Sequence, residues 1–291
     1  MSARDVPRPR TETAVAPPAR SRPDTSATRP LVDVHAHFAW AGGPRGDWQA
    51  ANQSRLDAGE RIGITLHVAS ILGSWGRTSP IYFPSPEDVT LGNDAMRAIA
   101  AAHPGLVKGY VTVNPNHTAH ALAEIERGLG AGMVGIKLAA SRRASDPLLD
   151  PIAEAAAEHR VPILQHAWQH RRREVSNQEI SDALDLLALA ARHPRAQFIL
   201  AHIGGGGDWA HSLRALRGVP NVYVDLSGSG VDRGMLELCL ECVGWERMLW
   251  GCDLTMDTGW AKLRALETMV ALDALEGIRW KTAARLFRLK L

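Results

Sequence analysis

The stretch Leu31-Val-Asp-Val-His-Ala-His37 decides the fold, because it joins a short apolar run to a pair of metal-compatible side chains. Alternate side chains of a β-strand point to the same face, so His35 and His37 at a strand end would place two imidazoles in one space. One such pair is weak evidence in a chain with 12 histidines. Later apolar runs, however, also end in a residue that can bind a metal: Lys137, His166, His202 and Asp253. This repetition indicates that strand ends from the whole chain meet at one site.

Short runs rich in apolar and β-branched residues recur after residue 30 and predict eight strands, at Leu31–Val34, Ile64–Ile71, Leu106–Val113, Met133–Leu138, Val161–Gln165, Gln197–Ala201, Asn221–Leu226 and Arg247–Gly251. Amphipathic stretches lie between them and predict helices, most clearly at Leu91–Ala102, Ala119–Leu129, Pro151–His159, Gln178–Arg192, Gly234–Val243 and Ala261–Leu272. Strands that alternate with helices form parallel sheets. Eight successive units favour an α/β fold of the closed (β/α)8 barrel type over an open doubly wound sheet.

Two long connections are predicted to be loops over the mouth of the barrel. The first, Phe38–Gly63, contains Gly42-Gly43-Pro44 and Trp48, and the second, Gly73–Pro86, contains Trp75, Tyr82 and two prolines. Tryptophans at positions 40, 48, 75, 168, 209 and 260 fall in or beside predicted loops. They either line an apolar or aromatic substrate pocket or wedge the loops onto the barrel.

The first 30 residues differ in composition from the rest of the chain. Residues 1–30 carry six arginines and are rich in Pro, Ser, Thr and Ala, which predicts a disordered N-terminal tail ahead of one domain over residues 31–291. The tail holds much of the positive charge, so the remainder of a chain whose net charge is +2 is close to neutral. We therefore expect a small-molecule substrate, and neither nucleic acid nor a membrane surface as partner. A homodimer formed through the outer helices is an open alternative to a monomer.

The cysteine content indicates a reducing compartment. Three cysteines do not make a disulfide framework in a domain of this size, and with no continuous apolar span we expect a cytoplasmic protein. Cys239 and Cys242 form a CxxC pair, but their segment has helical character and no second pair completes a zinc site. A packed helix face is the preferred interpretation.

In a barrel of this class the carboxyl ends of the strands converge on one face, where catalytic residues lie. Those ends carry four histidines and one aspartate, from the first, fifth, sixth and eighth predicted strands. Such nitrogen and oxygen ligands suit zinc or a similar divalent ion. The pattern therefore predicts a metal site at the carboxyl ends of the strands.

On these residues the chain resembles the amidohydrolase superfamily, and within it the amidohydrolase-related branch of metal-dependent hydrolases and nonoxidative decarboxylases. The resemblance covers residues 31 to about 288 and rests on Val32-Asp-Val-His-Ala-His37, Gly135-Ile-Lys-Leu138, Leu164-Gln-His-Ala167, Leu200-Ala-His-Ile-Gly-Gly205, Val222-Tyr-Val-Asp-Leu-Ser227 and Leu249-Trp-Gly-Cys-Asp253. The closing helix Lys281–Phe287 is similar too, although Lys281-Thr282 stands where Gly-Asn is common in the branch.

The resemblance implies that His35, His37 and His166 bind the metal, with Asp253 completing the sphere or hydrogen-bonding the metal-bound water. His202 would bind a second metal or polarise the substrate. Lys137 is either carboxylated, and then bridges two metals, or is a packing or salt-bridging residue. We expect one ion rather than two, Zn2+ in the first place and Mn2+ as the alternative.

Two reactions fit this site. The preferred one is hydrolysis of an amide, lactam, lactone or ester bond by a metal-activated water, with Asp253 and His202 as catalytic residues. The alternative is nonoxidative decarboxylation of an aromatic or enoic acid. In either case the predicted substrate contacts are Trp168, His170, Asp208, Trp209, Arg142, Thr255 and Asp257.

Overall fold

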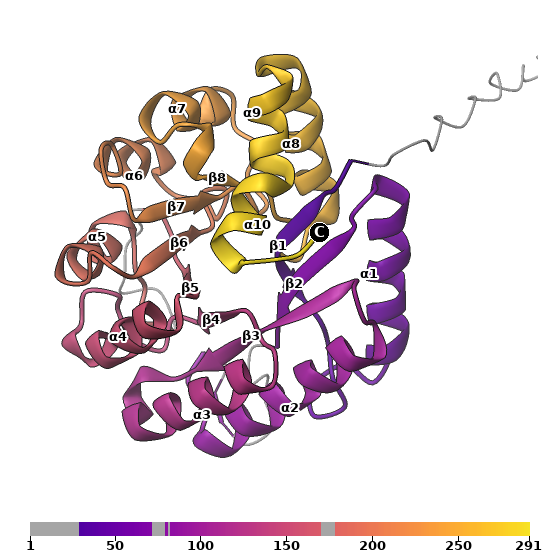
Figure 1. The fold of residues 1–291 in the computed structure, drawn as a ribbon, viewed down its shortest axis with the longest axis vertical. Helices are drawn as coiled ribbons and strands as arrows, with labels where there is room; N and C mark the ends of the chain where they lie inside the picture. The colour runs from indigo at the N-terminus through magenta and orange to yellow at the C-terminus, as the bar shows by residue number, and fades with distance from the viewer. Residues whose placement is uncertain (1–28, 72–78, 81, 170–177) are drawn as a thin grey trace, which may run out of the picture.

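The computed structural model describes residues 29–71, 79–80, 82–169 and 178–291. Eight parallel strands follow one another in chain order around a barrel (Figure 1). They are β1 Val32–His37, β2 Leu66–Ser70, β3 Val107–Val113, β4 Gly135–Leu138, β5 Pro162–His166, β6 Gln197–Ala201, β7 Val222–Asp225 and β8 Met248–Leu249. The predicted (β/α)8 class is confirmed, and each predicted strand overlaps an observed one. Most of the predicted tail, half of the predicted loop Gly73–Pro86, and His170 lie outside the described residues.

The barrel closes at a short seam between β1 and β8. The Val34 amide donates to the carbonyl of Trp250 (3.1 Å), and the Asp253 amide donates to the carbonyl of His35 (2.6 Å). A further parallel bridge pairs Ala36 with Asp253. Because β8 has two residues, main-chain bonds just beyond its end carry much of the closure.

Helices surround the strands on the outside of the barrel (Figure 1). They are α1 Trp48–Ile62, α2 Pro86–Ala102, α3 Thr118–Gly130, α4 Asp150–His159, α5 Ala183–Arg192, α6 Trp209–Ala215, α7 Met235–Cys242, α8 Met256–Met269, α9 Leu272–Glu276 and α10 Thr282–Phe287, with a π-helical turn at Gly277–Lys281. Capping explains two starts that differ from the prediction: Ser85 caps α2 with Pro86 behind it, and Asp182 opens α5 with a capping box. In α7, Cys239 and Cys242 are buried free thiols, which confirms a packed helix face.

The predicted loop Phe38–Gly63 is wrong over most of its length, because residues 48–62 form helix α1. The helix buries Asn52, Leu56 and Gly59, so its inner face lacks the run of large apolar side chains that marks a helix in sequence. Asn52 compensates by exchanging hydrogen bonds with the main chain of Ala39, at 2.8 and 2.9 Å. A polar anchor thus replaces the apolar stripe.

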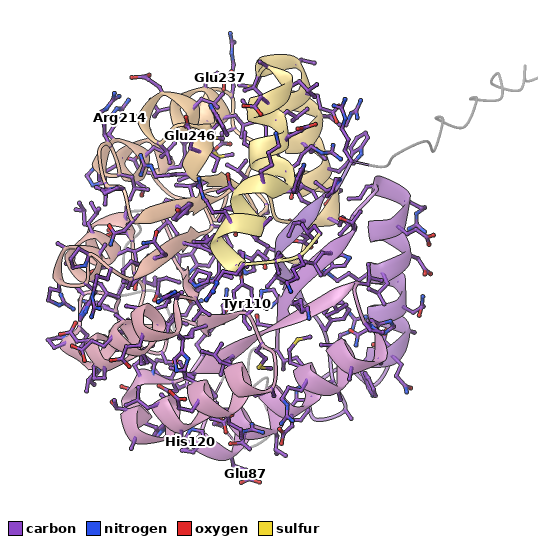
Figure 2. All side chains as sticks on the ribbon, in the orientation of Figure 1. Glu87, Tyr110, His120, Arg214, Glu237 and Glu246 are labelled. Atoms are coloured by element: carbon purple, nitrogen blue, oxygen red, sulfur yellow. The ribbon has the colours of Figure 1, made fainter. Side chains whose placement is uncertain are left out.

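The inside of the barrel is apolar toward the amino ends of the strands, where α10 plugs it. Ala283, Leu286 and Phe287 of α10 join the buried cluster formed by inward side chains such as Val32 and Val34. Tyr110 lies at the centre of this cluster, beneath α10 in Figure 2, and its ring contacts that of Phe287 at 5.7 Å between centroids. The amino end is therefore closed by packed side chains, and the polar side chains of the strand ends gather at the other mouth. Among the described residues, no helix is both long and apolar enough to cross a membrane.

Glu124 of α3 is a buried carboxylate that joins α3 to α2. It accepts hydrogen bonds from Asn93 (2.9 Å), Thr90 (3.2 Å) and Arg127 (2.7 Å). Asn93 in turn bonds the main chain of Thr112 in β3. Burial alone would raise the pKa of Glu124, but the hydrogen bonds from Arg127 and Asn93 bring it below its usual value.

We expect Glu124→Gln to lower the free energy of unfolding by about 1–3 kcal/mol at pH 7, because an amide nitrogen would face the donor groups of Asn93 or Arg127. The contribution of an ionised carboxylate with a lowered folded-state pKa is present above the unfolded pKa and is lost as the pH falls through the folded one. The difference between variant and wild type should therefore shrink below about pH 4. Urea unfolding followed by circular dichroism at pH 7 and at pH 3.5 measures it, and a constant difference would contradict the assignment.

Candidate metal centre

A β-bulge in β1 aims the histidine pair. Asp33 pairs with His67, and Ala36 pairs with Ala69. Between these two pairings β1 therefore contains one residue more than β2. Val32 and Val34 face the barrel interior, while Asp33 faces outward to His67. The extra residue then turns the strand, so that His35 and His37 both point into the mouth. Simple alternation, from which the pair was predicted, would have put Asp33 on the same face as the histidines.

His35, His37 and Asp253 form a group whose ligand atoms all lie within 4.8 Å of one another. The Nε2 atoms of the two histidines are 3.1 Å apart. An oxygen of Asp253 lies 3.2 Å from Nε2 of His37 and 3.8 Å from Nε2 of His35. Asp253 has a left-handed backbone with φ of 55°, a conformation that aspartate tolerates better than most residues.

The partners of the other ring nitrogens make this group fit a cation. Nδ1 of His35 faces the Asp225 carboxylate at 2.6 Å, and Nδ1 of His37 faces the Ser70 carbonyl at 3.3 Å. Each acceptor requires a proton on Nδ1, so we assign both Nε2 atoms as lone-pair bearers. Two lone pairs and a carboxylate oxygen then face one point, and they require positive charge there, which the Lys137 ammonium supplies to Nε2 of His35 at 2.9 Å and a bound cation would supply to all three. The donor set suits Zn2+ or Mn2+.

Asp225, at the end of β7, supports His35 from behind. It is fully buried and bonds His35, and it accepts a hydrogen bond from the Ser227 amide at 2.9 Å. Burial raises its pKa to about 6, although the hydrogen bonds from Ser227 act the other way. Among the described residues, Asp225 is thus the carboxylate that bonds the ring of His35. A carboxylate behind a histidine orients the ring and strengthens it as a metal ligand.

His166 and His202 stand beside this group. The His202 ring lies 5.6 Å from that of His35 and 5.3 Å from that of His166, centroid to centroid, and Nε2 of His202 is 3.4 Å from an oxygen of Asp253. Among the described residues, neither Nε2 of His166 nor Nδ1 of His202 has a hydrogen-bond partner, although both atoms are buried. Buried ring nitrogens of this kind are free to bind a cation or a substrate.

Lys137 is fully buried near the end of β4 and would compete with a cation for the His35 ring. Its ammonium lies 2.9 Å from Nε2 of His35, the atom that would bind a metal. Burial lowers the pKa of Lys137 to about 8, although Asp253 and Asp225 act to raise it. Nε2 has a single lone pair, so a cation bound there releases Lys137 from it. Carboxylation of this lysine stays a prediction.

Burial and the surrounding charges keep the imidazoles of His35 and His166 neutral and Asp253 ionised. Burial and the charge of Lys137 hold the pKa of His35 well below its usual range, and burial and His202 do the same for His166. Burial would raise the pKa of Asp253, but its contacts with His37, His35 and His202 hold it far below its usual range. Neutral imidazoles and an ionised carboxylate are the forms that bind metal.

Of the predicted substrate contacts, Trp168 is the one that lies against the histidines of the candidate metal centre. Its ring meets His166 and His202 edge to face, with centroids 5.7 and 6.1 Å apart. Tyr82, which sequence reasoning did not select, stacks on His166 at 5.8 Å. The sequence could not single out Tyr82, because its position depends on the conformation of the connection between β2 and α2. Together the two rings give the mouth an aromatic wall.

Four of the other predicted substrate contacts that the structure describes have partners of their own. Trp209 donates its indole N–H to Asp232, and Asp208 accepts the His211 amide at the start of α6. Three more lie on surrounding loops and helix starts: Arg142 beside Asp146, Thr255 bonded to Thr258, and the exposed Asp257 in the first turn of α8. Their role toward a substrate stays a prediction.

Lys262 of α8 is a buried residue that sequence reasoning missed, since one lysine in an amphipathic helix carries no signal. Its ammonium donates to the carbonyls of Gly228 (2.6 Å) and Ser227 (3.3 Å). Gly204 approaches it so closely that an added Cβ would lie 2.7 Å from the Lys262 nitrogen. The lysine thus joins the loops after β6 and β7, one of which follows His202 and the other Asp225.

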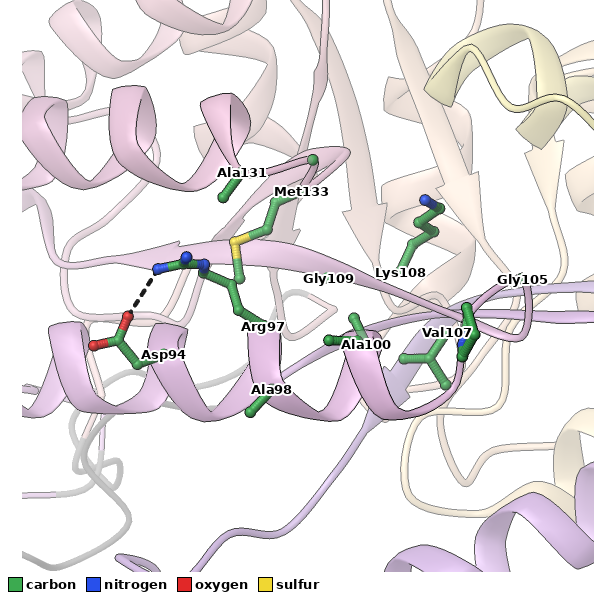
Figure 3. A pocket seen from close by; sticks show the side chains of 13 residues that line it. Asp94, Arg97, Ala98, Ala100, Gly105, Val107, Lys108, Gly109, Ala131 and Met133 are labelled. Carbon is green, nitrogen blue, oxygen red and sulfur yellow. Dashed lines mark hydrogen bonds and ion pairs between the residues drawn. The ribbon is translucent and has the colours of Figure 1, made fainter.

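A groove of about 750 Å3 lies away from this centre, between the end of α2, the start of β3 and the turn before β4. Figure 3 shows Arg97, Lys108 and Met133 around it, with Asp94 paired to Arg97. It borders the amino end of β3, whereas the histidines stand at the carboxyl ends of their strands. A cavity of about 270 Å3 borders the centre itself, lined by His37, Arg55, Leu254 and other residues.

Comparison with known proteins assigns the family. The family model described as Amidohydrolase matches residues 32–289, so the chain belongs to this family of enzymes. No curated protein sequence matches the chain.

Solved structures with the same fold include decarboxylases of aromatic acids. A 2,6-dihydroxybenzoate decarboxylase from Rhizobium is 18% identical, with a TM-score of 0.70 over 89% of this chain and 99% of that one. A 5-carboxyvanillate decarboxylase from Sphingomonas paucimobilis is 18% identical, with a TM-score of 0.67 over 90% and 100%. A dihydroxybenzoic acid decarboxylase from a Polaromonas species, with bound manganese and 2-nitroresorcinol, is 17% identical, with a TM-score of 0.70 over 90% and 97%.

We expect metal-stripped protein reconstituted with Mn2+ to hold one ion per chain, because one group of three donors gathers around one point in the part of the chain that the structure describes. Lys137→Met should leave that number unchanged, and His37→Ala should greatly reduce it. Elemental analysis after desalting measures the content. Two ions per chain in the wild type, falling to one in Lys137→Met, would instead identify Lys137 as a bridging ligand.

Proposed function

We propose that this protein is a metal-dependent nonoxidative decarboxylase of a hydroxylated aromatic acid. The observation that carries the proposal is the aromatic wall of Tyr82 and Trp168 beside the His35, His37 and Asp253 group. The similar structures named above, which act on dihydroxybenzoates and on 5-carboxyvanillate, support it. Hydrolysis, the reaction preferred from sequence, has no such support among them and becomes the second candidate.

His35, His37 and Asp253 would hold the ion, with His166 and His202 beside them. When bound, the metal supplies a Lewis acid that orients a carboxylate and a neighbouring hydroxyl of the substrate. Mn2+ is our preferred ion, because the Polaromonas decarboxylase contains manganese and because Mn2+ accepts mixed histidine and carboxylate ligands. Zn2+, expected from sequence, is the alternative.

Asp253 would transfer a proton from the substrate hydroxyl to the ring carbon that loses CO2. Asp253 is ionised at rest, so it first accepts the proton of the substrate hydroxyl. The electron pair left on the hydroxyl oxygen then raises the electron density of the aromatic ring. The proton passes from Asp253 to the ring carbon that bears the carboxylate. The bond between that carbon and the carboxylate breaks, CO2 leaves, and the electron pair of the broken bond restores the aromatic ring. The phenolate product takes a proton from water, and Asp253 ends as it began.

The Asp253 carboxyl faces His37 at 3.2 Å in the mouth, so it would stand beside a substrate held by the ion. His202 contacts the other oxygen of Asp253 at 3.4 Å and would keep the carboxyl aligned. The Trp168 ring stands edge-on to both His166 and His202, which leaves a flat aromatic substrate a wall to pack against.

We expect the Mn2+-loaded protein to release CO2 from one or more ortho-hydroxybenzoates, and in D2O to place one deuterium on the vacated ring carbon. Asp253→Asn should lose about 10²- to 10⁴-fold in kcat, since an amide cannot carry the proton. CO2 detection and proton NMR of the product measure the two outcomes.

Asp273→Asn, which changes an exposed carboxylate paired with Lys281, serves as the matched control and should keep full activity. A parallel set of esters, lactones and amides tests hydrolysis. Turnover there that depends on Asp253, with no CO2 from any hydroxybenzoate, would replace the proposal with its alternative.

A further inference from the structure

Arg55 of α1 is a nearly buried guanidinium, 10% exposed, that touches the main chain of the candidate metal centre from outside the barrel. One of its terminal nitrogens donates to the carbonyl of Asp253 at 2.7 Å. The other donates to the carboxylate of Asp33 at 3.0 Å. Arg55 therefore joins α1 to Asp253, four residues beyond the end of β8, and to β1 at the same time.

Asp33 collects donors from both sides of the barrel seam. One carboxylate oxygen accepts the main-chain amides of His35 (3.1 Å) and Cys252 (2.9 Å). The other accepts Arg55 and the His67 ring, which lies at 3.1 Å. The carboxylate is fully buried, so these bonds replace all contact with water.

The two side chains thus fix the segment that carries Asp253 against the segment that carries His35. Asp253 has a positive φ, and such a backbone persists where its surroundings hold it. Its amide is held by the carbonyl of His35 and its carbonyl by Arg55. The spacing between the His35 ring and the Asp253 carboxylate is set by this arrangement.

We propose that Arg55 is a positioning residue of the metal centre, which holds Asp253 at metal-binding distance from His35 and His37 by clamping its carbonyl to Asp33. The inference rests on the metal centre described above and is independent of the reaction that the centre performs. A lysine could not replace the arginine fully, because one ammonium on a flexible stem lacks the planar fork that reaches two acceptors at once.

The experiment is titration calorimetry of the metal-stripped protein with Mn2+ for the wild type, Arg55→Lys and Arg55→Met, and with Zn2+ for the wild type. We expect Arg55→Met to weaken binding about 10- to 100-fold, the range found when residues behind metal ligands are changed. Arg55→Lys should give an intermediate loss. Melting curves without metal establish that each variant is folded at the titration temperature, and if Arg55→Met does not fold, Arg55→Lys decides.

Glu124→Gln is the matched control, because it removes a buried ionic contact between α2 and α3, outside the metal centre. It should lower the melting temperature and leave Mn2+ affinity unchanged. Mn2+ affinity within twofold of wild type in the Arg55 variants, or an equal loss in Glu124→Gln, would overturn the proposal. A wild type that binds neither Mn2+ nor Zn2+ would overturn it together with the metal centre, whereas tight Mn2+ binding without CO2 release affects the proposed reaction alone.

Discussion

The closure of β1 against β8 is the constraint on which the rest of this structure depends. A two-residue strand offers few main-chain bonds, and the carboxylate of Asp33 supplies additional ones by accepting the amides of His35 and Cys252. The same contacts bring the histidine pair at the start of the barrel to the aspartate at its end. Fold and site therefore share one set of interactions, and a change that opens the seam would also separate the metal ligands.

The positive and negative charges around the mouth come from several strands and one helix and do not form isolated pairs. Lys137 reaches inward from β4, and Lys262 lies behind the loops that follow β6 and β7. Burial lowers the pKa of each ammonium to about 8, while burial raises that of Asp225 to about 6. Buried charges of this kind are costly unless each is hydrogen-bonded, and the carbonyls of Ser227 and Gly228 serve Lys262 in that role. A cation bound by His35 and His37 would add positive charge next to the Asp253 carboxylate.

The repeating pattern of apolar runs was enough to predict the barrel, since each run is a local feature and parallel strands with helical crossovers follow from their order. It also predicted which strand ends carry the histidines and Asp253. It could not predict α1, whose inner face is anchored by Asn52 instead of a stripe of apolar residues. The bulge in β1 was equally hidden, because it is set by pairing with β2 and leaves no trace in the order of residues. Arg55 and Lys262 reach the site from the outer helices α1 and α8, and one charged residue in a helix looks in sequence like any solvent-facing one.

The plug that α10 makes in the barrel ties the end of the chain to its beginning. Phe287 packs in the same cluster as Val32, about 255 positions earlier in the sequence. During synthesis on a ribosome, the first strand therefore emerges long before the residues that will cover its inner face. Until the closing helix arrives, the barrel interior stays open to water, so the nascent chain exposes a channel of apolar side chains that other chains could occupy. The half-made protein is thus the form in which a chaperone would matter most, and the packing of α10 ends that exposure.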